Sequence, residues 1–344
     1  MKGVRGRGPL ARTSGPSLLA LLLILGPLCA GARAQAATTP RPSEPSASVT
    51  LTALDGEKKS VTALKAEDLR LIVDGAPREI LGLRSQAGLP LLLAVVIDTS
   101  ASQEGVLPYT KMAAQVFVRG VMVPGFDRAA VVTFSHETTL EQALTDDVTQ
   151  AREAVGRVEF VPPPGYLGRG VVVAGPPPAG AAGSTGLWDA VHLVADEVLS
   201  PAEGAGRRAV LLVTDGVDTS SRLKLDDAVR SAWKSGAAVY AVGVGDEKAF
   251  DGVDKGALRK LAERTGGRAF FPKKTDELPA IFKQIDQELR SQYVITFAAP
   301  GPARDGAFHK VKIEVAEPSL RKQGLDIAYP RGFRAGDAPA AVRK

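Results

Sequence analysis

The segment Leu91–Ser102 (LLLAVVIDTSAS) decides the fold, because it joins a wholly apolar run to a set of oxygen-bearing side chains. Its first part, Leu91–Ile97, has no polar residue, which is typical of a parallel strand buried on both faces. Asp98, Ser100 and Ser102 follow at once in an Asp-x-Ser-x-Ser pattern. In an open α/β sheet, ligands bind beyond the carboxyl ends of the strands. The segment therefore predicts a buried strand that ends at a binding site.

Strand and helix patterns alternate through residues 89–290. Further strands are expected at Ala129–Phe134, Ala209–Thr214, Ala237–Val244 and Arg268–Phe271. Helices are expected at Lys111–Val118, Thr149–Val158, Leu187–Leu199, Asp226–Lys234, Lys255–Arg264 and Glu277–Leu289. Repeated β-α units of this kind predict an α/β domain with a doubly wound, mainly parallel sheet that is covered by helices on both faces.

The two flanks of this domain contain only short β-like runs. These are Ser48–Ala53, Leu69–Val73 and Arg78–Leu83 before it, and Tyr293–Phe297, Lys310–Val315 and Leu325–Tyr329 after it. Each flank is too small to bury a core of its own. We therefore expect 48–88 and 291–333 to pair in one small β-sandwich-like domain, with the α/β domain of 89–290 inserted between its halves. Residues 334–344 are expected to form a flexible tail.

The N-terminus has the pattern of a secretory signal peptide. The basic excess of the chain, a formal net charge of +5, comes from the leader, and basic and acidic residues balance without it. Arg5, Arg7 and Arg12 precede the apolar run Leu18–Leu25, and a small-x-small cleavage pattern ends at Ala34. Residues 1–34 are therefore expected to be removed, which places the mature protein in the periplasm or outside the cell.

Composition excludes several classes of protein for the mature chain. The single cysteine, Cys29, lies in the leader, so the mature chain has no disulfide. Residues 35–47 form a Pro/Ser-rich spacer, and no later stretch approaches the roughly 20 apolar residues that cross a bilayer. An aromatic content of 5% argues against the recognition of stacked bases, so no nucleic-acid partner is expected. A Pro/Gly-rich stretch, Val161–Gly183, is expected to form a long loop or flap.

Two further positions extend the set of oxygen ligands. Asp215 follows the predicted strand Ala209–Thr214, and Thr185 stands at the start of a predicted helix. The expected metal ligands are Asp98, Ser100, Ser102, Thr185 and Asp215. Three hydroxyls and two carboxylates suit Mg²⁺ or Mn²⁺ and disfavour zinc or copper. An open position on such a cation attracts an Asp or Glu carboxylate of a protein partner.

The order, spacing and strand-end placement of these five residues resemble the metal-ion-dependent adhesion site of von Willebrand factor type A domains. The resemblance covers Leu89–Arg290. Four wider stretches are similar to the bacterial exported "VWFA-related" group, namely Leu69–Gly75 (LRLIVDG), Thr214–Asp218 (TDGVD), Leu261–Phe271 (LAERTGGRAFF) and Leu289–Val294 (LRSQYV).

The resemblance also implies a role for each ligand. It implies that Ser100 and Ser102 bind the metal directly, that Thr185 does so when the partner is bound, and that Asp98 and Asp215 act largely through water. The implied function is an exported, non-enzymatic adhesion or assembly module. The Pro/Gly-rich stretch directly precedes Thr185, where it is able to shield or displace this ligand.

Two alternatives remain open at this point. One is a metal-assisted hydrolase that uses the same ion, and the other is a type A scaffold whose hydroxyls only cap helices. Against the hydrolase, there is no Gly-x-Ser-x-Gly motif, and His136, His192 and His309 are scattered, with none expected after a strand end. Asp189 and Asp218 are interpreted as turn or capping residues, and Asp218 also as a possible supporting residue for the ligands.

Overall fold

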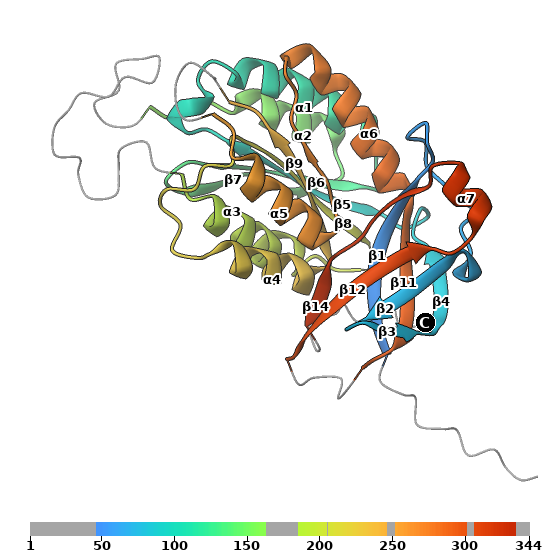
Figure 1. The fold of residues 1–344 in the computed structure, drawn as a ribbon. Coiled ribbons are helices and arrows are strands. Elements are labelled where there is room, and N and C mark those ends of the chain that lie inside the picture. Colours follow the sequence, from blue (N-terminus) through green and yellow to red (C-terminus); the bar gives the residue numbers. More distant parts are fainter. Residues whose placement is uncertain (1–45, 163–184, 205, 246–251, 301–305, 335–344) are drawn as a thin grey trace, which may run out of the picture. The chain divides into compact units, whose positions relative to one another are not determined.

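The computed structural model describes residues 46–162, 185–204, 206–245, 252–300 and 306–334, and arranges their strands in three sheets (Figure 1). The central sheet has six strands in the order β10-β9-β8-β5-β6-β7. Their bounds are β5 Leu91–Asp98, β6 Arg128–Phe134, β7 Thr138–Thr145, β8 Arg207–Thr214, β9 Ala237–Gly243 and β10 Ala269–Phe270. All pairs in this sheet are parallel except β6 with β7.

The middle of this sheet is built from the predicted apolar run. All eight residues of β5 are buried, and Val95 lies between Val131 of β6 and Leu211 of β8. Alternate residues of β5 enter different cores, because Leu93 packs on one face of the sheet and Leu92 on the other. The continuous apolar pattern of the strand therefore reflects burial on both faces.

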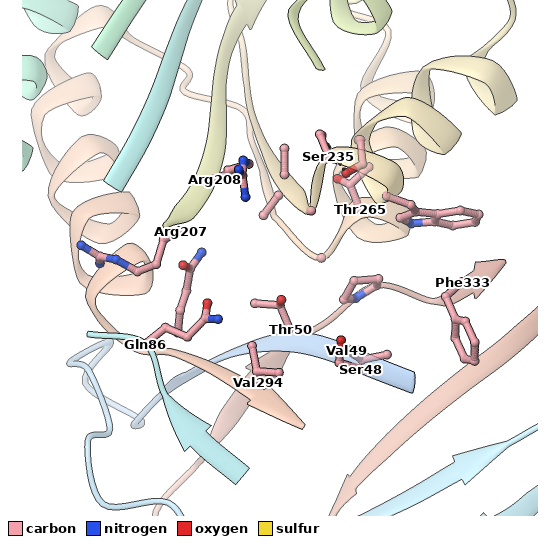
Figure 2. A pocket seen from close by; sticks show the side chains of 18 of the residues that line it. Ser48, Val49, Thr50, Gln86, Arg207, Arg208, Ser235, Thr265, Val294 and Phe333 are labelled. Atoms are coloured by element: carbon pink, nitrogen blue, oxygen red, sulfur yellow. Dashed lines mark hydrogen bonds between the residues drawn. The ribbon is translucent and has the colours of Figure 1, made fainter. Parts of the chain in front are cut away.

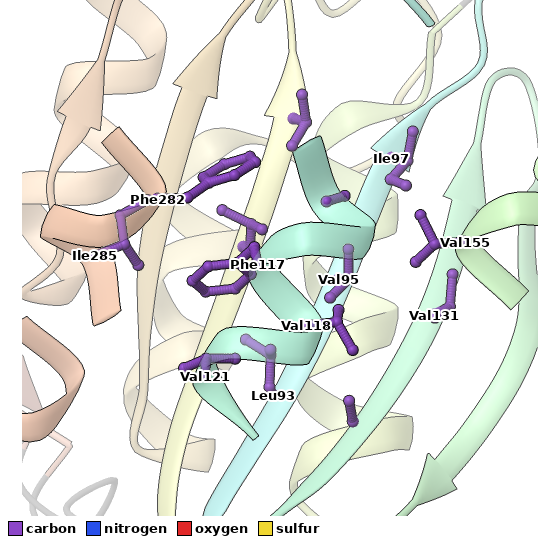
Figure 3. Packing of buried hydrophobic residues seen from close by; sticks show 14 of the residues in the cluster. Leu93, Val95, Ile97, Phe117, Val118, Val121, Val131, Val155, Phe282 and Ile285 are labelled. Carbon is purple, nitrogen blue, oxygen red and sulfur yellow. The ribbon is translucent and has the colours of Figure 1, made fainter. Parts of the chain in front are cut away.

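Helices cover both faces of the sheet, which confirms the predicted doubly wound α/β fold (Figure 1). On one face lie α1 (Leu107–Val121), α2 (Val148–Arg157) and α6 (Leu278–Arg290), and Figure 3 shows Phe117 of α1 close to Phe282 of α6, with ring centroids 5.2 Å apart. On the other face lie α3 (Leu187–Leu193), α4 (Leu225–Ser235) and α5 (Lys255–Thr265). Two hydrophobic cores thus share one sheet.

Two elements of this domain differ from the sequence prediction. The single helix expected at Leu187–Leu199 is an α-helix only to Leu193 and continues as a π-helix, η3 (Val194–Leu199), in which Ser200 N donates to Ala195 O five residues earlier. The edge strand β7 was not predicted, because its largely exposed, polar sequence lacks an apolar face.

The flanking segments form two four-stranded antiparallel sheets with one common core. Their orders are β13-β1-β11-β4 and β14-β12-β2-β3, and each sheet combines strands from both flanks. The bounds are β1 Ser46–Leu54, β2 Leu69–Val73, β3 Ala76–Arg78, β4 Ile80–Ser85, β11 Gln292–Ala298, β12 Phe308–Val315, β13 Asp326–Ala328 and β14 Gly332–Arg334. Leu51 and Ile295 from the first sheet share a core with Leu71 and Ile313 from the second. We call this pair of sheets the sandwich.

Three details of the sandwich differ from the sequence prediction. The run expected at Arg78–Leu83 is two strands, β3 and β4, which are separated at Glu79. A short helix, α7 (Pro318–Lys322), and the strand β14 were not predicted, and β14 ends at Arg334, inside the predicted tail. Strands of three residues carry too little periodicity to be found from a pattern.

One buried arginine holds together the two chain crossings between the sandwich and the α/β domain. Arg207, at the start of β8, donates from Nε to Leu89 O (2.9 Å) just before β5. It also donates from Nη1 to Leu289 O (2.6 Å) near the end of α6. The entry and the exit of the α/β domain therefore lie side by side.

Some predictions concern residues outside the described part of the chain. These are the leader 1–34, the spacer up to residue 45, the Pro/Gly-rich stretch from residue 163 onward and the tail from residue 335 onward. Within the described ranges, none of the helices has the length and apolar character that a bilayer crossing requires.

Candidate metal site

The carboxyl ends of β5 and β8 bring the two predicted carboxylates to one place. The strands are parallel neighbours, with Ile97 opposite Val213, so Asp98 lies beside Thr214. Asp98 Oδ2 accepts a hydrogen bond from Thr214 Oγ1 (2.6 Å), and Asp98 Oδ1 accepts one from Ser100 N (2.8 Å). Both carboxylate oxygens of Asp98 are therefore fixed by neighbouring groups.

The two serine hydroxyls lie between the carboxylates. Ser100 Oγ and Ser102 Oγ are 3.2 Å apart, and Ser102 stands in a short 3-10 helix, Ala101–Gln103. The side chain of Ser102 also hydrogen-bonds to the carboxylate of Asp215. Asp98, Ser100, Ser102 and Asp215 thus form one continuous cluster of oxygen atoms.

Electrostatics in this cluster favour the arrival of a cation. Asp98 is 1% exposed and Asp215 is 4% exposed, and neither forms an ion pair with any described cationic side chain. Burial, with added repulsion from Asp215, raises the pKa of Asp98 to about 7. Burial also raises the pKa of Asp215, against hydrogen bonds from Ser102 and Gln103. A divalent cation would supply the positive charge that both carboxylates lack, so the residues fit the predicted metal.

The donor atoms of this cluster suit a hard cation. No group of three or more His, Cys, Asp or Glu side chains that would suit a metal occurs in the described ranges. The cluster instead combines two carboxylates with hydroxyl oxygens, which agrees with Mg²⁺ or Mn²⁺ chemistry rather than that of a Cys/His zinc centre.

The fifth predicted ligand, Thr185, is held by the loop that follows β8. Thr185 is buried, its N donates to Thr219 Oγ1 (2.7 Å), and its O accepts from Thr219 N (2.9 Å) and Ser220 N (3.2 Å). The next residue, Gly186, donates from N to Ser135 O (2.7 Å) beyond β6. The hydrogen bonds of the described residues join Thr185 to these loops and not directly to the other four predicted ligands.

Three residues of the site were missed from the sequence. Thr214 orients Asp98, Thr219 holds Thr185, and Gln103, which is buried, donates from Nε2 to Val244 O (3.2 Å) and also hydrogen-bonds to Asp215. Thr214 and Gln103 directly flank predicted ligands or their motif, and this adjacency was a usable signal. The contact of Thr219 spans 34 residues and left no local pattern.

Of the two residues interpreted as turn or capping residues, Asp218 caps a helix, whereas Asp189 stands in the first turn of α3 and binds a distant loop. Asp218 Oδ1 accepts from Leu187 N (3.0 Å) at the start of α3. Asp189 accepts from Arg222 N (3.0 Å) and Leu223 N (2.9 Å). These bonds tie the loop after β8 to the first turn of α3.

The histidines require one correction. His192 contacts Ser231 Oγ (2.6 Å), and His309 contacts Asp74 Oδ2 (2.7 Å) in the sandwich. The expectation that no histidine follows a strand end was wrong, because the exposed His136 comes two residues after β6. The apolar pattern of the sequence already ends at Phe134, so the position of His136 after this strand could be read from it.

Together, the fold and the cluster define a doubly wound α/β domain with a candidate cation site at the carboxyl ends of its central strands. Residues 179–284, within this α/β domain, match the family model of the von Willebrand factor type A domain. No curated protein matches the sequence.

Several solved structures are similar to this chain. An aerotolerance-related membrane protein from Bacteroides fragilis is 18% identical, with a TM-score of 0.43, and the match covers 58% of this chain and 98% of that one. Proximal thread matrix protein 1 from the mussel byssus, with a zinc-occupied metal-ion-dependent adhesion site, is 20% identical with a TM-score of 0.47 over 62% of this chain and 48% of that one. A von Willebrand factor type A protein from Catenulispora acidiphila is 13% identical with a TM-score of 0.44, over 86% and 74%.

Proposed function

We propose that this protein is an exported binding module that docks an acidic group of a partner protein through a divalent cation, Mg²⁺ or Mn²⁺. Asp98, Ser100, Ser102, Thr185 and Asp215 would hold the ion. The observation that carries the proposal is the pair of buried carboxylates, Asp98 and Asp215, that lack a cationic partner among the described residues. Leaving two such charges uncompensated is costly, and a bound cation removes that cost.

The residues around the ion would orient its ligands. The Thr214 hydroxyl and the Ser100 amide engage the two oxygens of Asp98, and Ser102 and Gln103 do the same for Asp215. These bonds keep each carboxylate in one orientation, as supporting residues do around metal ligands. The bound cation supplies an electrophilic centre for a carboxylate oxygen from outside.

We propose binding rather than hydrolysis as the role of this site. Asp98 and Asp215 would both be engaged by the ion, and His192 and His309 are bonded to Ser231 and Asp74. His136 is the residue near the site that a hydrolase would use, because it lies in the turn beside Gly186. Generic phosphatase, esterase and peptidase substrates with Mg²⁺ and Mn²⁺ test this point. Turnover that is lost in both Ser100→Ala and His136→Ala would replace the binding role by the hydrolase.

Export belongs to the same proposal. We infer cleavage after Ala34, so that the mature protein begins at Gln35 in the periplasm or outside the cell, where a docking partner with an exposed Asp or Glu is found. N-terminal sequencing of the mature protein checks this. A retained leader would contradict it.

The metal proposal is tested by titration calorimetry with Mg²⁺. Ser100→Ala and Ser102→Ala each remove one hydroxyl oxygen and are expected to weaken Mg²⁺ binding by about tenfold, on the scale of one hydrogen bond or ligand contact to a charged group. Thr99→Val is the matched control, because the Thr99 hydroxyl donates to Phe134 O (3.1 Å) and not to the cluster. Unchanged Mg²⁺ affinity in both alanine variants would show that this site no longer binds metal.

The partner's chemistry is tested next, with a glutamate-containing peptide and its glutamine counterpart. Binding of the first alone, and only with Mg²⁺ present, supports docking through a carboxylate. Equal binding of both peptides, or binding in the presence of chelator, would contradict it.

A further inference from the structure

A second cavity lies far from the candidate metal site, at the opposite ends of the central strands. It has a volume of about 920 Å³, and its lining includes Thr50 and Val294 of the sandwich and the first residues of β8 and β9 (Figure 2). This volume is in the range of cavities that hold small organic molecules. Nothing in the proposed metal-dependent docking uses this cavity.

The floor of the cavity is the face of sheet β13-β1-β11-β4 that points away from the sandwich core. Thr50 lies opposite Val294, which lies opposite Arg84, and Ser48 lies opposite Thr296. Directly opposed residues of antiparallel strands share a face, and all five line the cavity. The core-facing residues alternate with them along each strand. The floor therefore presents hydroxyl groups and one guanidinium.

The charged side chains in the described lining of the cavity are all cationic. Arg84, Arg207, Arg208 and Lys234 line it, and its described lining contains no carboxylate. Lys234 has a distant partner, with its Nζ 3.7 Å from Asp196 Oδ2. Arg84 and Arg208 form no ion pair with any described residue.

The guanidinium groups of both arginines of β8 are held in place by backbone carbonyl oxygens. Arg208 donates from Nε to Leu199 O (3.0 Å) and from Nη2 to Ala202 O (3.1 Å). Arg207 is fixed between two carbonyl oxygens, as described above. Burial lowers the pKa of both guanidiniums, and in Arg208 the charge of Arg128 adds to this effect. Arg207 has a counter-charge in Asp127, with Nη2 3.9 Å from Asp127 Oδ1, whereas Arg208 forms no ion pair with the described residues. A fixed, partly desolvated cation without a counter-charge attracts an anion, and Arg208 is such a cation.

One buried polar group in the lining also lacks a partner. Gln292 Oε1 makes no hydrogen bond, although Gln292 is only 2% exposed. Buried polar groups are almost always paired. The Gln292 amide presents its NH₂ group when it rotates by 180°. In that orientation it is suited to a ligand with acceptor oxygens.

The geometry points to a binding site for a small organic anion in this cavity. Its carboxylate, sulfonate or phosphate group would lie against Arg208, Arg84 and the hydroxyls of the floor. Its apolar body would pack on Leu89, Val294 and Phe333, which also line the cavity. Charge-assisted hydrogen bonds from guanidinium to such groups are among the strongest in proteins.

Titration calorimetry with naphthalenesulfonate tests the site, with naphthol as the neutral probe of the same ring. Chelator is present throughout, so a failed metal site does not affect the result. One naphthalenesulfonate per chain is expected to bind, and naphthol more than about tenfold more weakly, as for the loss of a charge-assisted hydrogen bond. Absence of saturable naphthalenesulfonate binding, or equal binding of both probes, would overturn the proposal.

Point variants locate the probe. Arg208→Gln and Arg84→Gln are each expected to weaken naphthalenesulfonate binding about tenfold. Arg70→Gln is the matched control, since Arg70 is an exposed strand arginine of the other sheet and does not line the cavity. The Arg84 side chain forms no hydrogen bond or ion pair with the described residues, so its variant remains informative if Arg208→Gln does not fold. Unchanged affinity in Arg84→Gln and in a folded Arg208→Gln would place the probe elsewhere.

A carboxylate built into the floor gives a test without any probe. Thr50→Glu would put an anion into the cavity, on the same face of the sheet as Arg84, so it should abolish naphthalenesulfonate binding and raise the melting temperature relative to Thr50→Gln. A lower melting temperature for Thr50→Glu than for Thr50→Gln would mean that the arginines do not require an anion.

Discussion

At the scale of single residues, a few carboxyl groups are buried where their ionised form is unfavourable. Asp98 and Asp215 repel each other at the strand ends, and Glu288 is fully buried in α6. Glu288 Oε1 lies 2.8 Å from Arg268 Nε, but Glu288 Oε2 has no hydrogen-bond partner. Such groups are where pH acts on stability, because their protonation differs between the folded and unfolded states.

Removing one charge of the aspartate pair should stabilise the metal-free protein. In Asp215→Asn the Val217 N–H keeps an acceptor, since Val217 N donates to Asp215 Oδ1 (3.0 Å) in the native site. With chelator at about pH 8, the free energy of unfolding should rise by about 1 kcal/mol as the repulsion on Asp98 disappears. Urea denaturation measures this change, and calorimetry should show lost Mg²⁺ binding. A loss of stability in chelator would contradict the repulsion.

Glu288 should make the protein less stable as pH rises. Burial raises the pKa of Glu288 to about 7 from 4.5. Between these values the folded state binds more protons than the unfolded state, so the free energy of unfolding falls with rising pH. Glu288→Gln removes this dependence. The free energy of unfolding of the variant, relative to that of the wild type, should therefore rise by up to about 3 kcal/mol between about pH 4.5 and pH 7.

The Glu288 prediction has a control on the same domain. Glu263→Gln, at an exposed position of α5, should leave the pH dependence of urea denaturation unchanged. Parallel pH profiles for the wild type and Glu288→Gln would show that Glu288 titrates near its ordinary pKa in the folded protein.

At the scale of elements, the start of α3 depends on a distant loop. Its N-cap residue, Gly186, has no side chain to cap the helix. Asp218 Oδ1 accepts from Leu187 N, and Ser221 Oγ accepts from Trp188 N (2.9 Å). The loop after β8 therefore supplies the cap, and it also holds Thr185.

Loss of this cap should affect the helix and the metal site together. Asp218→Ala leaves Leu187 N without its acceptor and should lower the free energy of unfolding by about 1 kcal/mol, the usual cost of a lost cap. Mg²⁺ affinity should fall too, because Thr185 directly precedes the capped turn. Asp218→Asn keeps an acceptor oxygen and should restore both. Full Mg²⁺ affinity in Asp218→Ala would show that Thr185 is held independently of α3.

Element prediction from the sequence succeeded where burial leaves a pattern. The run Leu91–Ile97 and the strand Ala209–Thr214 are buried on both faces, so their apolar residues are continuous. The polar residues that follow each run mark its end in the sequence. The strand β7 was missed because an exposed edge strand has no apolar face to reveal it. The support that Thr219 gives Thr185 depends on a contact across two loops, and no local propensity encodes such a contact.

At the scale of the whole molecule, the described chain has separate hydrophobic cores. The two cores of the α/β domain contain only residues from Leu91 to Leu289. The core of the sandwich combines Ala47–Val73 with Tyr293–Phe333. The α/β domain therefore contains all the residues of its own cores, whereas each half of the sandwich contains only part of one.

This division predicts different behaviour for excised segments. Residues 89–290 should fold alone and show the cooperative thermal unfolding of a domain, because both of their cores are complete. Neither 46–88 nor 291–334 should fold alone, since each loses the strands that pair with its own. Circular dichroism of the three segments measures this. A folded 46–88 would contradict the shared core.

The joint at Arg207 has a consequence for the order in which the chain folds. Pairing Val49 with Ile295 in a disordered chain means closing a loop of about 250 residues, at an entropic cost of about 5 kcal/mol. Once the α/β domain has folded, Arg207 holds Leu89 and Leu289 side by side, and that closure is already made. The sandwich should therefore assemble last, on a scaffold that the inserted domain provides. In the proposed export, β1 would leave the membrane first and stay unpaired until β11 follows, so this strand is the segment that would most need protection from aggregation.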